Sequence, residues 1–326
     1  MDTSLTTVRL GTTDMTITRV GFGAWAVGGS GWAFGWGQQD DDDSVTAIRH
    51  AVERGVNWID TASVYGLGHS EEVVARALAD LPEADRPYVF TKGGMDWSSD
   101  PSARAERIAE PRALRRQLED SLRRLDVEQI DLYQVHWPAE DGTRLEEYWQ
   151  AMLDFKAEGK VRAIGLSNHD VGALERAEAL GHVDTLQPPY SAIRRDSAVD
   201  LLPWCADHGV GTIVYSPMGS GLLTGAFSAE RVAALPKDDW RHADPAFTTH
   251  LEQNLTISAA LGEVARRHGV EQPAAAVAWV LGTRGVSGAI VGARTPAQVD
   301  GWVPGGSLEL TDDDYALVAA AGAPRP

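Results

Sequence analysis

Three short apolar runs of this chain each end on an ionisable side chain, namely Asp60, Lys92 and His136. A tyrosine, Tyr65, follows the first of them after one short turn. A free tyrosine has a pKa of about 10, and a lysine ammonium within about 4–6 Å would lower that pKa by favouring the phenolate. A carboxylate such as Asp60 beside the lysine would keep the ammonium charged and in place. The four residues therefore predict an acid–base centre that uses neither a nucleophile nor a metal.

In this centre Tyr65 would donate its proton to a carbonyl oxygen as hydride arrives at the carbon, and would accept the proton in the reverse direction. A neutral His136 would donate a hydrogen bond to the same oxygen and orient the substrate. Each residue taken singly also has a structural explanation. Lys92 is the hardest to explain in that way, because burying a lysine is costly unless it is paired.

The elements that must position these residues alternate along the chain. Short apolar runs predict eight strands, at Val20–Gly23, Trp58–Asp60, Tyr88–Thr91, Leu132–His136, Val161–Leu166, Thr185–Gln187, Gly211–Tyr215 and Ala289–Val291. Amphipathic stretches between them predict helices, among them Asp42–Arg54, Glu71–Leu81, Arg112–Leu125, Glu146–Glu158 and Ile257–His268, with Ser70 and Thr143 as N-terminal caps. These units predict an α/β fold, a closed (β/α)8 TIM barrel, with a doubly wound sheet as the alternative. A barrel would bring the four residues to one rim, since the carboxyl ends of its strands meet there.

Two segments depart from the alternation. Thr7–Val20 precedes the first barrel strand and predicts a β-hairpin that turns between Gly11 and Asp14. Ser216–Asn254 is too long for an ordinary connection and predicts a functional loop at the C-terminal face of the barrel. Since no linker-like tract divides the chain, residues 1–326 are expected to form a single domain.

The composition excludes several classes of protein. A net charge of −18 argues against nucleic acid or an anionic membrane as a partner, because both need a basic surface. The single cysteine, Cys205, rules out an internal disulfide and a cysteine-rich metal site. No apolar run has the length of a membrane span, and the first residues lack the apolar core of a signal peptide. A soluble cytoplasmic protein is expected.

Asp60, Tyr65, Lys92 and His136, in this order and these contexts, resemble the Asp-Tyr-Lys-His tetrad of the aldo-keto reductase family. The resemblance covers nearly the whole chain and includes Gly23–Trp25, Gly165–His169, Gln187–Ser191, Tyr215–Gly225 and Val291–Gln298, each directly after a predicted strand. It points in particular to the bacterial members similar to general stress reductases and to the potassium-channel β-subunit branch.

The resemblance implies NADPH, with NAD as a possible substitute, lying extended across the barrel mouth. The implied contacts are Gly23, Ala24, Trp25 and Asp60 near the reacting end, Ser167, Asn168 and Gln187 at the nicotinamide carboxamide, and Tyr215 stacked on the ring. Ser216, Pro217, Met218, Gly219, Ser220, Leu222 and Gly225 would wrap the pyrophosphate, and Gly292, Arg294 and Gln298 would hold the adenosine end. Arg294 would bind the 2′-phosphate. Where many members carry Glu-Asn, this chain has Val299–Trp302, which weakens the expected grip on adenine.

One other motif is a coincidence. Gly21–Ala26 matches the dinucleotide fingerprint G-x-G-x-x-A, but that fingerprint requires a helix at once, and the next predicted helix begins near Asp42.

Tryptophans are concentrated on the loops expected around the site. A substrate pocket formed by Trp25, Trp32, Tyr65, Trp97, His136 and Trp137 is predicted, with Trp36 and Trp240 nearby. The expected partner is a small carbonyl or alcohol substrate, and the expected state is a monomer. Two alternatives to a reductase remain open: an NAD(P)-dependent sugar or alcohol dehydrogenase working in the oxidative direction, and a nucleotide-binding regulatory redox sensor.

Overall fold

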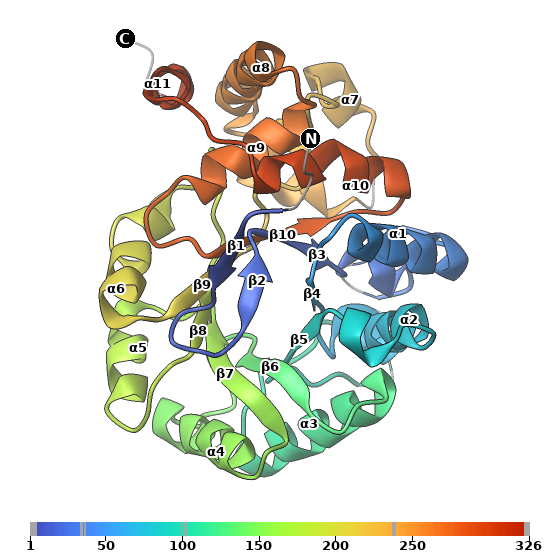
Figure 1. Ribbon diagram of the computed structural model, residues 1–326, viewed down its shortest axis with the longest axis vertical. Coiled ribbons are helices and arrows are strands. Elements are labelled where there is room, and N and C mark those ends of the chain that lie inside the picture. The colour runs from blue at the N-terminus through green and yellow to red at the C-terminus, as the bar shows by residue number, and fades with distance from the viewer. Residues whose placement is uncertain are drawn as a thin grey trace.

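The structure is a computed structural model that describes residues 5–32, 35, 37–98, 100, 103–236 and 239–322. Eight parallel strands form a closed barrel in the order β10-β3-β4-β5-β6-β7-β8-β9, ringed by helices (Figure 1). The barrel strands are β3 Val20–Gly23, β4 Trp58–Asp60, β5 Tyr88–Gly93, β6 Ile130–Val135, β7 Val161–Ser167, β8 Thr185–Gln187, β9 Gly211–Val214 and β10 Gly288–Gly292. The predicted TIM barrel is confirmed, and each strand lies where its apolar run predicted it, to within two residues at either end.

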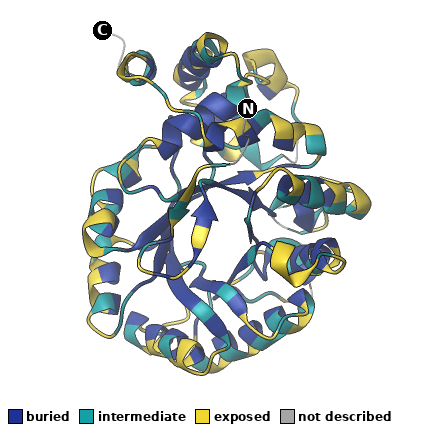
Figure 2. Cartoon of the chain, viewed as in Figure 1, coloured by how far each residue is buried: buried dark blue, intermediate teal, exposed yellow. Residues whose placement is uncertain are grey.

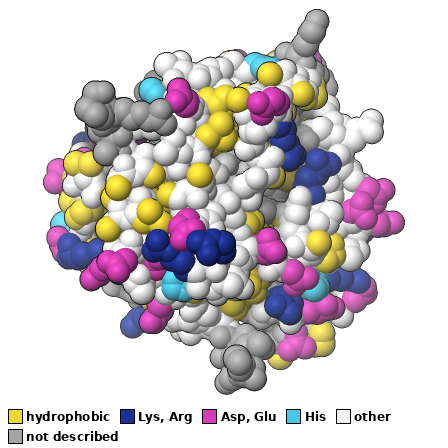
Figure 3. Space-filling model, turned by 90° about the horizontal axis from the view of Figure 1, so that it is seen from above, with side chains coloured by type: hydrophobic (Ala, Val, Ile, Leu, Met, Phe, Trp, Pro, Cys, Tyr) yellow, Lys and Arg dark blue, Asp and Glu magenta, His cyan; other side chains and the backbone are white. Residues whose placement is uncertain are grey.

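Most helices pack around the barrel with one face buried and the other exposed, whereas α9 is buried over nearly its whole length (Figure 2). They are α1 Asp41–Glu53, α2 His69–Leu78, α3 Pro111–Leu125, α4 Leu145–Ala157, α5 Val171–Glu178, α6 Leu201–His208, α7 Ala229–Ala233, α8 Leu251–His268, α9 Gln272–Leu281, α10 Pro296–Trp302 and α11 Asp312–Ala321. Among the described residues, none of these helices has both the length and the apolar character needed to cross a membrane. Acidic and basic side chains are interspersed over the face drawn in Figure 3.

The two predicted caps are wrong. α2 begins at His69, after Gly68 in a left-handed conformation, so Ser70 lies inside the helix. Its hydroxyl donates instead to the carbonyl of Ala24 at 2.9 Å and ties α2 to the loop after β3. At the start of α4, Arg144 occupies the cap position without a capping hydrogen bond, one residue beyond Thr143.

A hairpin closes the amino-terminal end of the barrel. β1 Thr7–Arg9 pairs antiparallel with β2 Thr16–Thr18, as predicted, and the hairpin lies across the end of the barrel that faces the viewer in Figure 1. Its buried side chains pack with inward-facing side chains of the barrel in one apolar cluster, made of Leu10, Met15, Ile17, Trp58, Phe90, Leu132, Ala163, Ile213 and Ile290. This end is therefore a packed core, not an opening.

Trp58 is the largest side chain of that cluster. It fits because two neighbouring strand positions, Gly21 and Gly288, carry no side chain. A methyl group at Gly21 would lie 2.2 Å from the indole ring, and one at Gly288 would lie 3.0 Å from it. Glycine at these two strand positions leaves the volume that the indole fills.

Two residues beyond this apolar cluster, the inward-facing side chains of several strands change from apolar to polar. Because strand side chains alternate between faces, the next inward positions after Trp58, Phe90 and Leu132 are Asp60, Lys92 and Gln134. Thr185, Gln187 and Ser167 add further buried polar groups. An apolar layer below and a polar layer above thus divide the interior, and the polar layer faces the C-terminal end.

Candidate active site

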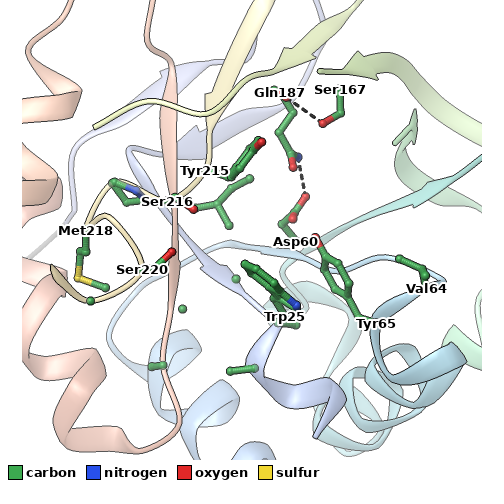
Figure 4. A pocket seen from close by; sticks show the side chains of 18 of the residues that line it. Trp25, Asp60, Val64, Tyr65, Ser167, Gln187, Tyr215, Ser216, Met218 and Ser220 are labelled. Carbon is green, nitrogen blue, oxygen red and sulfur yellow. Dashed lines mark hydrogen bonds between the residues drawn. The ribbon is translucent and has the colours of Figure 1, made fainter. Parts of the chain in front are cut away.

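One continuous cavity opens at the carboxyl ends of the barrel strands. Its walls include the predicted Asp60, Tyr65 and His136. Figure 4 shows Asp60 and Tyr65 there, together with Trp25 and Tyr215. Lys92 does not line the cavity, because it is fully buried behind these residues. The barrel thus brings the four predicted residues to one rim, as their positions at strand ends indicated.

Asp60 and Lys92 form an ion pair at the floor of the cavity. The Lys92 ammonium donates to Asp60 Oδ1 at 2.6 Å and to the carbonyl of Thr61 at 2.8 Å. Gln187 Nε2 donates to the second carboxylate oxygen of Asp60 at 2.9 Å. Burial raises the pKa of the Asp60 carboxyl and lowers that of the Lys92 ammonium, and their mutual contact opposes both changes. The pair is held in one geometry by charge-assisted hydrogen bonds.

Tyr65 lies between this pair and two tryptophans. The Lys92 nitrogen is 5.2 Å from the centroid of the Tyr65 ring, and the rings of Trp25 and Trp32 lie 6.3 and 6.2 Å from it. The expectation that the pKa of Tyr65 is lowered is wrong. Burial raises that pKa well above 10, and the negative charge of Asp60 adds to the rise. The phenol is therefore protonated at neutral pH.

His136 lies beside Tyr65 and is neutral. Its ring meets the Tyr65 ring edge-on, with centroids 5.7 Å apart. Burial lowers the pKa of the imidazole well below 6.5, and the positive charges of Lys92 and Arg107 lower it further. A neutral imidazole beside a protonated phenol provides two hydrogen-bond donors for one oxygen atom, which is the arrangement expected from the sequence.

The residues predicted to hold a nicotinamide carboxamide form a hydrogen-bonded group beside Asp60. Ser167 Oγ donates to the Gln187 carbonyl at 2.8 Å, and Asn168 Nδ2 donates to Ser167 Oγ at 3.0 Å. Tyr215 donates its hydroxyl to Asn168 Oδ1 at 2.8 Å. Asn168 itself has a left-handed backbone, with φ of 61°, which turns its side chain back over the barrel. The group lies along the wall of the cavity.

The loop after β9 provides free backbone donors. Ser216, Gly219, Ser220 and Gly221 all have positive φ, between 54° and 94°. The amides of Gly219 and Leu222 close turns within the loop, to Ser216 and Gly219 respectively. No hydrogen bond joins the amides of Met218 and Ser220 to any described residue. Successive turns with unpaired N–H groups form a concavity suited to an anion such as a pyrophosphate.

Most of the predicted contacts line the cavity. For the cofactor these are Gly23, Ala24, Trp25, Asp60, Ser167, Asn168, Gln187, Tyr215, Ser216, Pro217, Met218, Ser220, Gly292, Arg294 and Gln298, and for the substrate Trp25, Trp32, Tyr65, His136 and Trp137. Trp240, from the long loop, lies with its ring 6.3 Å from that of Trp25. Trp36 lies outside the described residues.

Four predicted contacts lie elsewhere. Gly219 and Leu222 were expected to offer backbone N–H groups to the pyrophosphate, but their amides donate to the carbonyls of Ser216 and Gly219. Neither residue lines the cavity, and Gly225 does not line it either. Leu222 is fully buried against Val232 and Phe247. Trp97 packs behind Tyr65 with Met95 and Val64 and does not reach the cavity.

Several lining residues escaped the sequence reasoning. Arg194, Arg231 and Arg241 line the cavity in addition to Arg294. Arg107 lines the cavity as well. Its guanidinium carbon lies 4.4 Å from the centroid of the Trp137 ring, and its Nη1 contacts Glu140 Oε1 at 2.5 Å. Arginines and acidic residues line the described cavity in equal numbers, so the arginines offer individual cationic contacts for phosphate groups and no net positive charge. Their positions in the segments that follow barrel strands at the carboxyl ends were the available signal.

The chain was compared with protein families and with proteins of known structure. The model of the aldo/keto reductase family matches residues 19–323. Aldo-keto reductase YhdN of Bacillus subtilis is 35% identical over 88% of this chain and 85% of its own length. The NADH-specific methylglyoxal reductase of Escherichia coli is 33% identical over 95% of this chain and 96% of its own. The solved structure of the glycerol dehydrogenase AKR11B4 from Gluconobacter oxydans is 36% identical with a TM-score of 0.88, and the match covers 100% of this chain and 98% of that one. The chain is a member of the aldo/keto reductase family of oxidoreductases.

Proposed function

We propose that this protein is an NADPH-dependent reductase that converts aldehydes and ketones to alcohols, with Tyr65 as the proton donor. The observation that carries the proposal is the placement of a protonated Tyr65 and a neutral His136 on the same cavity wall, 5.7 Å apart between ring centroids. Both would donate to the carbonyl oxygen, which gains negative charge as the carbon is reduced.

The residues of the cavity fit a nicotinamide dinucleotide. Ser167, Asn168 and Gln187 would hold the carboxamide, and the free amides of Met218 and Ser220 would hold the pyrophosphate. Arg294 would bind the 2′-phosphate. When bound, the cofactor supplies the hydride.

Each side chain then has a defined task. Tyr65 releases its proton to the alkoxide oxygen, and Lys92 stabilises the phenolate that remains. Asp60 keeps Lys92 charged and fixed in position, since its carboxylate contacts the ammonium at 2.6 Å. His136 holds the carbonyl oxygen beside the phenol. Trp25, Trp32 and Trp137 exclude water and offer flat apolar walls to the substrate.

The protonation state of Tyr65 supports reduction as the proposed direction. Reduction needs a phenol, and oxidation of an alcohol needs a phenolate. Because burial raises the pKa of Tyr65, the phenol is the dominant form at neutral pH, which favours reduction. Alcohol oxidation is the second candidate, supported by the similarity to a glycerol dehydrogenase, and it would be favoured at alkaline pH.

The test is titration of the purified protein with NADPH and with NADH, followed by turnover. Tryptophans in the cavity wall make quenching of intrinsic fluorescence a direct measure of binding. We expect tighter binding of NADPH, and its consumption when 4-nitrobenzaldehyde or methylglyoxal is added. Tight binding with glycerol oxidation but no aldehyde reduction would reverse the proposed direction. Failure to bind either nucleotide would overturn the proposal.

A further inference from the structure

A loop far away in the sequence holds one edge of the Arg294 guanidinium. Arg294 Nε donates to Gln39 Oε1 at 2.5 Å, and Nη2 donates to the main-chain carbonyl of Gln38. Gln39 Nε2 in turn donates to the Arg294 carbonyl at 3.2 Å. One amide side chain therefore both accepts from and donates to Arg294, which fixes the orientation of both side chains.

The contacts with Gln39 and Gln38 occupy one edge of the Arg294 guanidinium and leave another edge open. A guanidinium is planar and carries five N–H groups, so that it can bind oxygen pairs along more than one edge. Nε and Nη2 form the edge occupied by Gln39 and Gln38. No hydrogen bond joins Nη1 to any described residue. The end of the fork that contains Nη1 and the second Nη2 hydrogen is available to a ligand, and Arg294 lines the cavity.

The loop is itself anchored at this point. Asp40, the next residue, caps α1 by accepting hydrogen bonds from the amides of Asp42 and Asp43. Gln298 Oε1 accepts a hydrogen bond from the backbone amide of Arg294 at 2.7 Å and so helps to hold the backbone of Arg294 in place. The carboxylate of Asp300 contacts His50 at 2.9 Å and Arg54 at 3.4 Å, and among the described residues no ion pair joins it to Arg294.

We propose that Gln39 is a positioning residue that holds Arg294 with the open end of its fork toward the 2′-phosphate of NADPH, and so sets the preference of this protein for NADPH over NADH. The inference rests on the proposed function for the identity of the ligand. The physical reason is entropic: an unrestrained arginine loses rotamer freedom when it binds a phosphate, whereas one already fixed by Gln39 does not.

The experiment is a double-mutant cycle on binding, with Gln39→Met and Arg294→Met, alone and together. Methionine keeps the length of the Gln39 side chain and removes both of its polar contacts. Dissociation constants for NADPH and NADH come from fluorescence titration, so no substrate is required. We expect Gln39→Met to weaken NADPH binding about fivefold and to leave NADH binding unchanged, because one arginine must then be ordered on binding. In the Arg294→Met background, Gln39→Met should have no further effect.

Gln38→Ala is the matched control. Arg294 contacts Gln38 through its main-chain carbonyl, so removing the side chain should leave the NADPH-to-NADH ratio unchanged. The inference is overturned if Gln39→Met leaves that ratio unchanged or raises it, or if its effect persists without Arg294. Binding of neither nucleotide by the wild type would instead overturn the proposed function, so the two failures are distinguishable.

Discussion

Replacing Lys92 by methionine would remove one member of a fully buried ion pair and leave the other in place. Asp60 is 2% exposed, and the Lys92 ammonium contacts it at 2.6 Å. Among the described residues, Gln187 would be the remaining donor to the carboxylate. Removing one partner of a buried pair costs about 3–5 kcal/mol, and we expect Lys92→Met to lower the free energy of unfolding by that amount at neutral pH.

The loss in the free energy of unfolding should depend on pH, and the burial of Asp60 sets the direction of this dependence. Burial raises the pKa of its carboxyl group, and Lys92 opposes that rise in the wild type. In the variant the folded pKa therefore lies further above the unfolded value of about 3.9. Below the unfolded pKa both states hold the proton and the electrostatic penalty vanishes. The penalty grows by about 1.4 kcal/mol per pH unit between the unfolded and the folded pKa of Asp60, and it is complete above the folded pKa.

Urea unfolding followed by tryptophan fluorescence, at several pH values between about 4 and 8, measures this dependence. The control is Asp60→Asn combined with Lys92→Met, which removes both charges. The double variant should recover much of the lost stability at neutral pH and lose the pH dependence. A Lys92→Met variant as stable as the wild type at neutral pH would refute the reasoning, as would a loss that persists undiminished in the Asp60→Asn background.

Three further predictions concern the same barrel. Tyr65→Phe should lower kcat for aldehyde reduction by about 10²–10⁴-fold while leaving the dissociation constant for NADPH nearly unchanged; steady-state kinetics showing most of kcat retained would exclude Tyr65 as the donor. Because the pKa of Tyr65 is raised and that of His136 is lowered, kcat/KM for reduction should be flat between about pH 6 and 9, and a titration in that range that disappears in Tyr65→Phe would contradict the assigned proton states. Gly21→Ala should destabilise the protein by about 1–3 kcal/mol by forcing a methyl group against Trp58, whereas Gly301→Ala, with open space around it, should not; equal melting temperatures for the two variants would disprove this account.

The barrel was predictable from the sequence because its signal is local. Each strand is a short apolar run, and the stretches between them have helical periodicity, so both appear without any knowledge of tertiary contacts. The chemistry of Asp60, Lys92 and His136 was visible for the same reason, since strand ends share one rim. The prediction of Ser70 as an N-terminal cap was wrong because its hydroxyl makes a tertiary hydrogen bond, to Ala24, in place of a local capping bond.

The remainder of the site depends on contacts that no local pattern records. The pKa of Tyr65 was expected to fall because Lys92 is near, but the sequence does not reveal how completely the fold buries the phenol. Trp97 stands in the expected segment, yet the direction of its side chain is set by packing against Val64 and Met95. The amide of Leu222 is used to close a turn within its own loop. Gln39 lies 255 residues from Arg294 and carries no motif of its own.

The division of the barrel interior into an apolar and a polar layer implies a conflict between stability and activity. The lower layer contributes stability by burying hydrocarbon, whereas the upper layer holds desolvated charges, and the Nε2 atom of Gln134 makes no hydrogen bond to a described residue. Replacing a buried ion pair by apolar residues of similar volume is often neutral or stabilising. Apolar substitution of both Asp60 and Lys92 should thus give an inactive protein that resists heat better than the wild type. Under selection for stability alone, the upper layer would be the first part of this barrel to be lost.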